Sequence, residues 1–336
     1  MILNSNHQKP VSELRFDLVS KDWVVIATGR DQRPETFAQQ RIREEAPAKD
    51  CPFCHLETQT QPLLEYKNEK GEREVAVIPN RYPAFSHSDS LHERAEGPYS
   101  IMDGVGFHEV VITRDHQKSL AEMNVSQVRR VIDAYQERYL ELANEKFVNY
   151  VSIFVNHGRE AGASLSHPHS QIIAIPLIDP DLQRSINGSR LFFENQGECV
   201  HCKMLEWDLE DKRRIIFENK EFVVLAPFAS RVAFEVRIYS KEHHAYFERI
   251  KDRAKDQLAE ALQIALNKIF KGLNDPAYNF FIHTAPSDGK DYGHYHWHFE
   301  ILPKTSIWAG FELGAGIEIS TVEPEKAAEY LREIKN

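Results

Sequence analysis

The 336-residue sequence is short of cysteine, of long apolar runs and of basic tracts. No stretch reaches the roughly 18 consecutive apolar residues that a membrane-spanning helix requires. The first residues, Met1–Asn6, also lack the apolar core of a signal peptide. We therefore expect a cytoplasmic protein without a membrane partner.

An excess of positive charge is also missing. The 41 lysine and arginine residues are outnumbered by 51 aspartate and glutamate residues, which gives a formal net charge of -10. Nucleic acids and anionic membranes attract basic patches, and no basic tract offsets the negative balance. We expect no nucleic-acid partner.

Only four cysteines are present, and all of them fall in two C-x-x-C pairs, Cys51 with Cys54 and Cys199 with Cys202. A cytosolic setting disfavours disulfides, whereas two thiolates at this spacing can bind the same metal ion. The cysteines therefore indicate metal ligation rather than a disulfide framework.

What the sequence does contain is a series of short strands and a few helical patterns. Apolar residues at helical spacing predict one helix from about Ser126 to Leu142 and another from Asp252 to Lys271, closed by Gly272. The polar stretch after Pro176 predicts irregular structure to about residue 198, and a short helix is expected near the C-terminus. Apolar or alternating runs predict strands at 14–17, 23–27, 74–79, 108–113, 149–155, 172–175, 222–226, 233–239, 278–283 and 294–303. These elements indicate an α+β fold with antiparallel sheets and crossing helices.

The elements recur in the same order in the two halves of the chain. Each half runs from a C-x-x-C pair to an acidic residue followed by histidine, then to a helix, a strand and a His-x-His strand that ends in proline. The repeat of about 150 residues is far longer than that of a solenoid. We therefore predict a duplicated fold with halves at 14–178 and 190–336.

The repeat nominates four metal ligands in each half. The first set is Cys51, Cys54, His116 and His167, and the second set is Cys199, Cys202, His243 and His296. Mixed thiolate and imidazole ligation is typical of tetrahedral Zn²⁺ sites. We expect two zinc ions per chain.

Spacing alone does not decide which histidine is the ligand at three of the four imidazole positions. The competing pairs are His243 or His244, His296 or His294, and His116 or His108. A histidine at the start of a strand, as in Phe107-His108-Glu109, is equally compatible with a structural role. His55 and His201, beside the cysteine pairs, are expected to be exposed.

The run His167-Pro168-His169-Ser170-Gln171 carries a second possible chemistry. Residues two apart in an extended segment point to the same side, so His169 and Gln171 share a face. A neutral imidazole can attack phosphorus and form a phosphoramidate, which divides one transfer into two steps. The amide of Gln171 can donate an N–H to a phosphoryl oxygen.

The segment from Asn156 to Ser164 precedes this run and contains Gly158 and Gly162. Glycine permits backbone conformations in which N–H groups surround a phosphate. A carbonyl of the same loop is the candidate acceptor for the ring N–H of His169, which would fix the tautomer. The sequence therefore predicts a nucleotidyl-transfer site.

Together these motifs resemble the galactose-1-phosphate uridylyltransferase branch of the histidine triad superfamily. The resemblance covers residues 14–334 and is carried by Gly29-Arg30-x-x-Arg33-Pro34, Cys51-Pro52-Phe53-Cys54, Asn80, Asp115-His116, Asn156-x-Gly158, Gly162-x-Ser164 and His167–Gln171. It implies a duplicated histidine-triad-like fold and ping-pong transfer of a nucleoside monophosphate through a covalent nucleotidyl-histidine.

The resemblance also implies roles for single residues. His169 would be the nucleophile and Gln171 the phosphoryl-contacting amide, which makes the N-terminal half catalytic. Residues that line the nucleotide and phosphate pocket would be Arg30, Arg33, Asn80, Asn156, Gly162 and Ser164, and those near the hexose would be Phe311 and Glu312. The C-terminal half would hold a structural metal and further substrate contacts. The implied partners are a nucleotide sugar, a hexose-1-phosphate and a second copy of the chain.

Three features depart from the best-known members of the family. Ser170 stands where those enzymes have glycine, Glu318 where they have glutamine, and a second C-x-x-C pair where bacterial ones have a different metal site. These features resemble a subgroup that includes plant ADP-glucose phosphorylase. The expected function is that of a UDP-glucose–hexose-1-phosphate uridylyltransferase of galactose metabolism, and an ADP-glucose phosphorylase or adenylyltransferase is the alternative.

Two other classes of protein stay open. The run His294-Tyr295-His296-Trp297-His298 resembles a complete histidine triad, which favours a nucleotide hydrolase with its nucleophile in the second half. Against that function, Ala285–Lys290 stands in the place of the glycine-bearing loop. A zinc-structured binding module would explain the cysteines but leaves His169 and Gln171 without a role.

Overall fold

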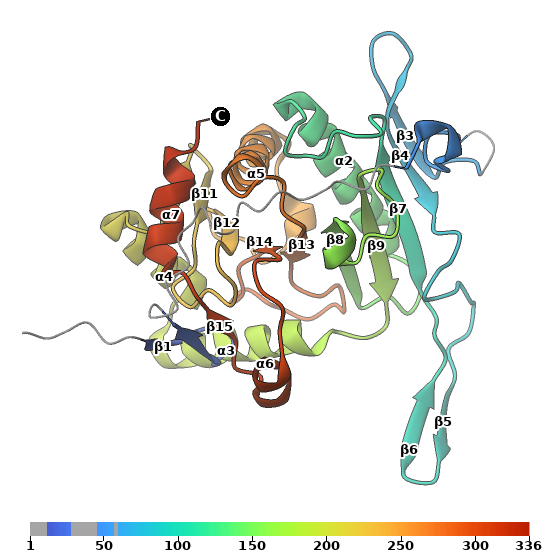
Figure 1. The fold of residues 1–336 in the computed structure, drawn as a ribbon. Helices are drawn as coiled ribbons and strands as arrows, with labels where there is room; N and C mark the ends of the chain where they lie inside the picture. Colours follow the sequence, from blue (N-terminus) through green and yellow to red (C-terminus); the bar gives the residue numbers. More distant parts are fainter. Residues whose placement is uncertain (1–11, 28–45, 57–59, 336) are drawn as a thin grey trace, which may run out of the picture.

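The structure is a computed structural model, and it describes residues 12–27, 46–56 and 60–335. A ten-stranded sheet runs through the molecule, and neighbouring strands pair antiparallel (Figure 1). From one edge its strands are β3 (Leu64–Lys67), β4 (Arg73–Pro79), β7 (Phe107–Thr113), β9 (His169–Ile175), β8 (Tyr150–His157), β13 (Tyr278–His283), β14 (His298–Pro303), β12 (Val236–Ser240), β11 (Phe222–Leu225) and β10 (Ile215–Glu218).

The order of strands confirms the duplication and the α+β class. From the edge inward, the first half runs β3, β4, β7, β9 and β8, and the second half runs β10, β11, β12, β14 and β13. The two sets meet where β8 pairs with β13, with Asn156 opposite Asn279. One sheet therefore spans both halves, and the boundaries 14–178 and 190–336 stay a prediction.

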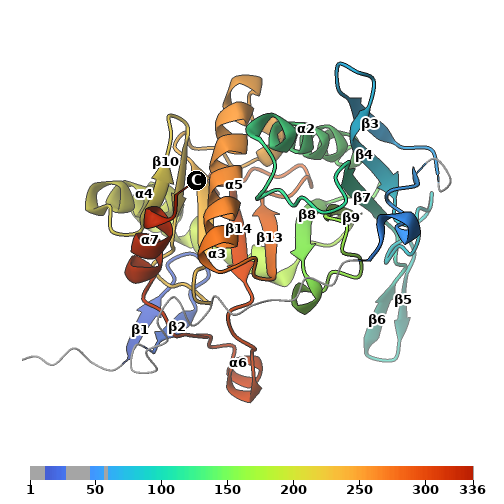
Figure 2. The ribbon, with the colours of Figure 1, turned by 45° about the horizontal axis from the view of Figure 1, so that its top comes forward.

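Two long helices cover one face of this sheet (Figure 2). They are α2 (Val125–Leu142) and α5 (Asp252–Gly272), as the helical patterns predict. Helix α2 begins with a capping box, in which Asn124 and Gln127 satisfy each other's backbone N–H groups. Arg129 of α2 reaches Asp252 and Asp256 of α5 and holds the two helices together.

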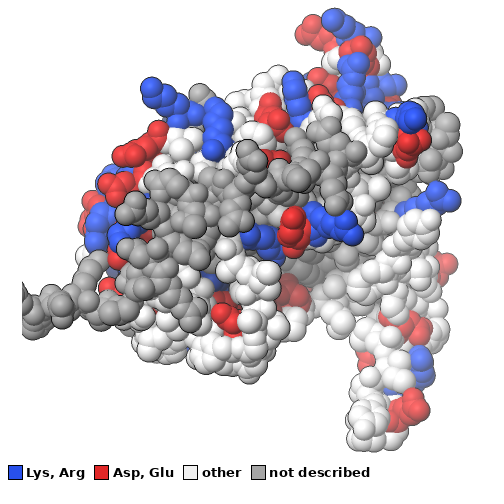
Figure 3. Space-filling model, viewed as in Figure 1, with Lys and Arg blue, Asp and Glu red and all other residues white. Residues whose placement is uncertain are grey.

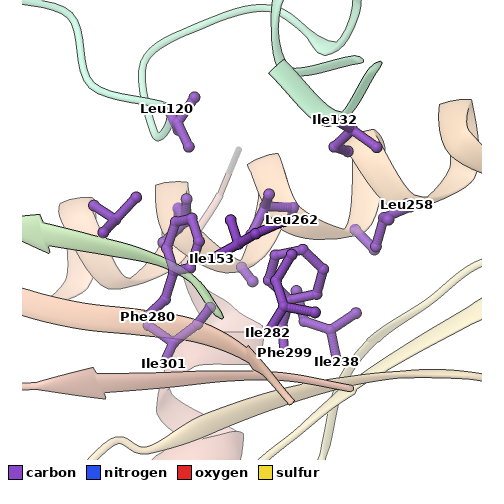
Figure 4. Packing of buried hydrophobic residues seen from close by; sticks show 14 of the residues in the cluster. Leu120, Ile132, Ile153, Ile238, Leu258, Leu262, Phe280, Ile282, Phe299 and Ile301 are labelled. Carbon is purple, nitrogen blue, oxygen red and sulfur yellow. The ribbon is translucent and has the colours of Figure 1, made fainter. Parts of the chain in front are cut away.

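The core lies between these helices and the sheet (Figure 4). Ile132 of α2 and Leu258 and Leu262 of α5 face Ile153, Phe280 and Phe299 of the sheet, and all of them are buried. The cluster includes residues of both halves, so burial of apolar surface stabilises the halves jointly. Every second residue of the central strands points to this core, and the residues between them point to the opposite face, which is partly covered in its turn by Leu182 and Ile186 of the segment after β9.

One prediction about the helices is wrong, and another needs adjustment. The stretch predicted to be irregular contains helix α3 (Pro180–Gln196), capped by Asp179 and ended by Gly197 in the left-handed region. Its buried residues are few, which explains the weak apolar pattern. Gly272 is the last residue of α5 rather than the residue beyond it, and a Cβ there would stand 3.2 Å from the Tyr330 ring, so close packing favours glycine at this position.

The remaining elements lie around this frame. A three-stranded sheet joins β1 (Glu13–Phe16), β2 (Trp23–Ile26) and β15 (Ile319–Ser320), and a hairpin of β5 (Glu93–Glu96) and β6 (Tyr99–Met102) projects from the body (Figures 1 and 2). The other helices are α4 (Val200–Asp211), α6 (Gly310–Ala315) and α7 (Pro324–Glu333), with short 3-10 turns η2 (Ala48–Asp50), η4 (Arg159–Ala161) and η5 (Phe247–Arg249).

Charge is mixed over the surface. Figure 3 shows acidic and basic side chains interspersed over the described part of one face. Among the described residues, no helix combines the length and the apolar composition needed to cross a bilayer.

Ser170 of β9 belongs to the side of the sheet that faces the helices. Its hydroxyl is hydrogen-bonded to the hydroxyl of Tyr135 on α2, and both side chains are buried. Ser170 therefore points away from the face that carries His169 and Gln171. A direct effect of Ser170 on a bound substrate is excluded by this orientation.

We predict that Ser170→Ala lowers the free energy of unfolding by about 1–3 kcal/mol, because it leaves the Tyr135 hydroxyl buried without its partner. Denaturant unfolding measures the loss. The double variant Ser170→Ala/Tyr135→Phe removes both polar groups and should be more stable than Ser170→Ala alone. Strictly additive losses would show that the two hydroxyls are not coupled.

Candidate active site

The first set of proposed metal ligands comes together beside the start of β9. Cys51 and Cys54 follow η2, His116 follows β7, and His167 precedes β9. The Nδ1 atom of His167 lies 3.5 Å from the Cys51 sulfur and 3.6 Å from the Cys54 sulfur, and the Nδ1 atoms of the two histidines lie 3.3 Å apart. Zinc–nitrogen and zinc–sulfur bond lengths predict edges of about 3.3–3.8 Å for such a tetrahedron. The donor set fits a zinc ion.

Hydrogen bonds on the far side of each ring orient these ligands. His167 donates from Nε2 to the carbonyl of Thr113 at 2.8 Å, and His116 donates from Nε2 to the carbonyl of Ala46 at 2.7 Å. Each Nδ1 lone pair is therefore directed toward the thiols. Since four protein side chains would fill the coordination shell, the ion would be structural.

The second half brings together the equivalent set. Cys199, Cys202, His243 and His296 place one ligand atom each within 4.8 Å of the others. His243 donates from Nε2 to the carbonyl of Gly293 at 2.9 Å, and the Nε2 of His296 lies 2.9 Å from the Ser240 hydroxyl.

Geometry separates the competing histidines. His244 instead lies 3.4 Å from the Glu242 carboxylate, and the buried Nε2 of His294 has no hydrogen-bond partner among the described residues. His201, expected to be exposed, is buried beside the Ser189 hydroxyl.

We predict close to two metal ions per chain when the purified protein is analysed by mass spectrometry. Cys54→Ala and Cys202→Ala should each lower the content to about one, because each removes a thiolate from a different four-ligand site. A wild-type value near one would contradict two equivalent sites.

His169 begins β9 and faces the open side of the sheet. Its Nδ1–H donates to the carbonyl of His167 at 2.9 Å, so the expectation of an acceptor in the Asn156–Ser164 loop is wrong. The carbonyl two residues back is closer because the extended chain brings it beside the ring. This bond leaves the Nε2 lone pair available. Burial lowers the pKa of His169, which keeps the imidazole neutral at neutral pH.

Phe53 links the first metal site to His169. Phe53 lies between Cys51 and Cys54 in the sequence. Its ring makes edge contacts with His167 and His169, with ring centroids 5.7 Å and 5.2 Å away. The metal site therefore supports the position of His169 through Phe53 as well as through the backbone.

Gln171 and Asn80 both contact His108, a residue for which the sequence patterns predict no role at a bound phosphate. The Oε1 of Gln171 is 2.8 Å from Nε2 of His108, and Nδ2 of Asn80 is 3.0 Å from the same nitrogen. The sequence patterns predict only a rival metal ligand or a structural role for His108. The period of two along β7 and β9 could have placed it on the open face.

The glycine-bearing loop follows β8 and turns around η4. Gly158 and Gly162 have φ of +85° and +91°, in the left-handed region that favours glycine. Asn279 of β13 donates to Oδ1 of Asn156 and to the carbonyl of Ala161, both at 2.8 Å. Asn279, a second-half residue that sequence reasoning missed, therefore orients the first-half amide.

Other proposed residues do not join this group within the described chain. Arg30 and Arg33 lie outside the described residues. Ser164 is exposed in the glycine-bearing loop, and Phe311 and Glu312 lie on α6, which stands away from β9 in Figures 1 and 2. Phe311 is 54% exposed, so its ring is free to contact another molecule.

The counterpart of His169 in the second half is His298, and its surroundings differ. Its Nδ1–H donates to the carbonyl of His296 at 3.0 Å, as in the first half. The ring, however, is stacked between Tyr239 and His283, with centroids 4.8 Å and 5.1 Å away. Burial lowers the pKa of His298 well below the usual value. This enclosed imidazole disfavours a hydrolase whose nucleophile lies in the second half.

Comparison with known proteins agrees with the arrangement. A family model described as galactose-1-phosphate uridyl transferase, N-terminal domain, matches residues 3–178. The chain is 34% identical to an ADP-glucose phosphorylase of Arabidopsis thaliana over 96% of this chain and 93% of the relative. It is 30% identical to the galactose-1-phosphate uridylyltransferase of Thermotoga maritima over 96% and 98%.

A solved structure matches equally well. The crystal structure of an ADP-glucose phosphorylase from Arabidopsis thaliana with bound ADP-glucose aligns with a TM-score of 0.81 and 32% identity over 97% of this chain and 100% of that chain. These matches define the class as an enzyme of nucleotidyl transfer. Within that class the chain belongs to the galactose-1-phosphate uridyl transferase family, which confirms the resemblance inferred from its motifs.

Proposed function

We propose that the chain transfers a uridylyl group between UDP-glucose and a hexose-1-phosphate, with His169 as the nucleophile. One observation carries the proposal: the bond from Nδ1 of His169 to the His167 carbonyl leaves a neutral Nε2 lone pair on the open face, beside Gln171. The N-terminal half is then catalytic, and the enclosed His298 supports a C-terminal half that holds a structural metal and contributes substrate contacts.

The proposed reaction has two balanced steps. Nε2 of His169 attacks the α-phosphorus, a nitrogen–phosphorus bond forms, and hexose-1-phosphate leaves with the electrons of the broken phosphorus–oxygen bond. A phosphate oxygen of the second hexose-1-phosphate then attacks the same phosphorus and releases His169. The amide of Gln171 would stabilise the charge on the phosphoryl oxygens.

The metal would be zinc, two ions per chain, held by the two Cys₂His₂ sets. It would supply structural support to His167 and His296 and take no part in the transfer. The reduced thiols in both sets suit a cytoplasmic location.

ADP-glucose phosphorolysis is the second candidate, since the Arabidopsis thaliana relative of that name is 34% identical and its solved structure holds ADP-glucose. In that reaction inorganic phosphate would replace the hexose-1-phosphate in the second step. The two candidates share His169 and differ only in the nucleobase and the acceptor.

We predict that UDP-glucose labelled at the α-phosphorus labels the protein through an acid-labile, base-stable linkage, and that galactose-1-phosphate removes the label. His169→Ala should abolish labelling, because the attacking nitrogen is lost, whereas His298→Ala should keep it per folded chain. The opposite pattern would favour the second-half hydrolase. Labelling only by ADP-glucose, with release by inorganic phosphate, would establish the second candidate, and no label from either donor would favour a binding module.

We also propose a homodimer in which α6 of one chain reaches the site of the other. The loop around α6 stands away from the body, and it exposes Ile307, Phe311 and Leu313 at 93%, 54% and 72%. An apolar surface of this kind is costly to leave in water and marks a contact with another chain. In a closed two-fold dimer each contact is made twice, so if one α6 reaches the partner's site, the other does so as well.

Co-expression of two inactive variants tests this arrangement. His169→Ala loses the nucleophile, and Phe311→Ala/Glu312→Ala loses the sugar contacts, so each should be nearly inactive alone. Random pairing should restore about a quarter of the wild-type activity, since half of the dimers would contain one intact site. A monomer by light scattering, or no recovery in the mixture, would contradict the shared site.

A further inference from the structure

His108 of β7 lies beside Gln171 of β9 on the open face of the sheet. In the register of these strands His108 is opposite Ile173 and Val110 is opposite Gln171, so His108 and Gln171 are diagonal neighbours. The Nε2 of His108 is 2.8 Å from the Oε1 of Gln171. This distance is that of a well-formed hydrogen bond.

The backbone determines which of the two atoms donates. The N–H of Ala84 is directed at Nδ1 of His108 at 3.2 Å, and a backbone N–H can only donate. Nδ1 must therefore be the acceptor, and a neutral imidazole then carries its hydrogen on Nε2. It follows that Nε2–H donates and that the Oε1 of Gln171 accepts.

This bond determines the direction of the Gln171 amide. The two ends of a carboxamide have nearly the same shape, but one donates hydrogen bonds and the other accepts them. With Oε1 held by His108, the NH₂ group is turned toward the ligand side. The reverse orientation would present a carbonyl oxygen to a negatively charged phosphoryl oxygen.

Asn80 is oriented by a separate contact. The N–H of Tyr82 donates to its Oδ1 at 2.9 Å, which leaves the NH₂ group of Asn80 near Nε2 of His108. Both of these nitrogens carry hydrogen, so Asn80 does not replace Gln171 as the acceptor.

We propose that His108 is a positioning residue, which holds the Gln171 amide in the orientation that donates to the transferred phosphoryl group. The proposal rests on the proposed function, since Gln171 contacts that group only if His169 is the nucleophile. His108 itself touches neither the phosphorus nor the attacking nitrogen.

Two substitutions at His108 separate its two hydrogen bonds. The carboxamide of asparagine reaches the place of Nδ1, so His108→Asn can keep the Ala84 contact but cannot reach Gln171. The longer His108→Gln places an N–H near Nε2 and keeps the Gln171 contact. His92→Asn, on the projecting hairpin, serves as a control outside the site.

The experiment measures the rate at which the chain becomes labelled in a single turnover with UDP-glucose, or with ADP-glucose if only that donor labels the wild type. His108→Asn should slow labelling by about tenfold to a hundredfold, the usual effect of losing an orienting partner, with little change in KM. His108→Gln should recover most of the lost rate. Metal content and the unfolding midpoint verify that each variant is folded.

A second comparison uses Gln171→Ala. If His108 acts through Gln171, His108→Asn should add no further loss in the Gln171→Ala background. Equal rates for the asparagine and glutamine variants, or independent losses in the double variant, would overturn the proposal while leaving His169 as the nucleophile. Absence of label on the wild type with either donor would instead refute the proposed function.

Discussion

The pairing of β8 with β13 is the contact on which the rest of the structure depends. It joins two five-stranded units into one sheet, one face of which is buried under α2 and α5, while the opposite face carries His169 and Gln171. Across this pairing Asn279 orients Asn156, and the glycine-bearing loop is held through Ala161. The candidate site therefore depends on the whole sheet rather than only on the half that carries His169.

Successive side chains of β9 point to opposite faces of the sheet, so the residues that pack against the helices differ from those at the candidate site. Ser170 and Ile172 point into the helix layer, whereas His169 and Gln171 point outward. Directly before this strand lies His167, a candidate metal ligand whose carbonyl accepts the hydrogen bond from the imidazole of His169. The candidate metal-ligand set before His169 and the buried hydroxyl pair at Ser170 thus both support the position of His169 and Gln171.

Much of this arrangement could be predicted from the sequence, because duplication makes each half a check on the other. The ligand sets, the central strands and the two long helices follow from recurring patterns. Helix α3 could not be predicted in this way, since a helix that buries only a narrow stripe leaves a weak periodic signal. The hydrogen bond from His169 to the His167 carbonyl also could not be predicted. Every residue has a backbone carbonyl, so the choice of acceptor depends on local backbone geometry and not on residue type.

Side-chain contacts between neighbouring strands also could not be predicted from the sequence. Asn279 and His108 act on residues far from them in the sequence, and register alone brings each pair together. Ser170 is the opposite case. It departs from the family motif, but its side chain points toward the helices and away from the face that carries His169.

The β8–β13 pairing also has a consequence for any attempt to isolate the half that carries His169. A fragment that ended near residue 178 would keep every motif of the nucleophile but would expose the N–H and C=O groups along one edge of β8. Free strand edges of this kind template pairing with other chains. In the full chain β13 pairs with this edge of β8, so the second half protects the first against aggregation.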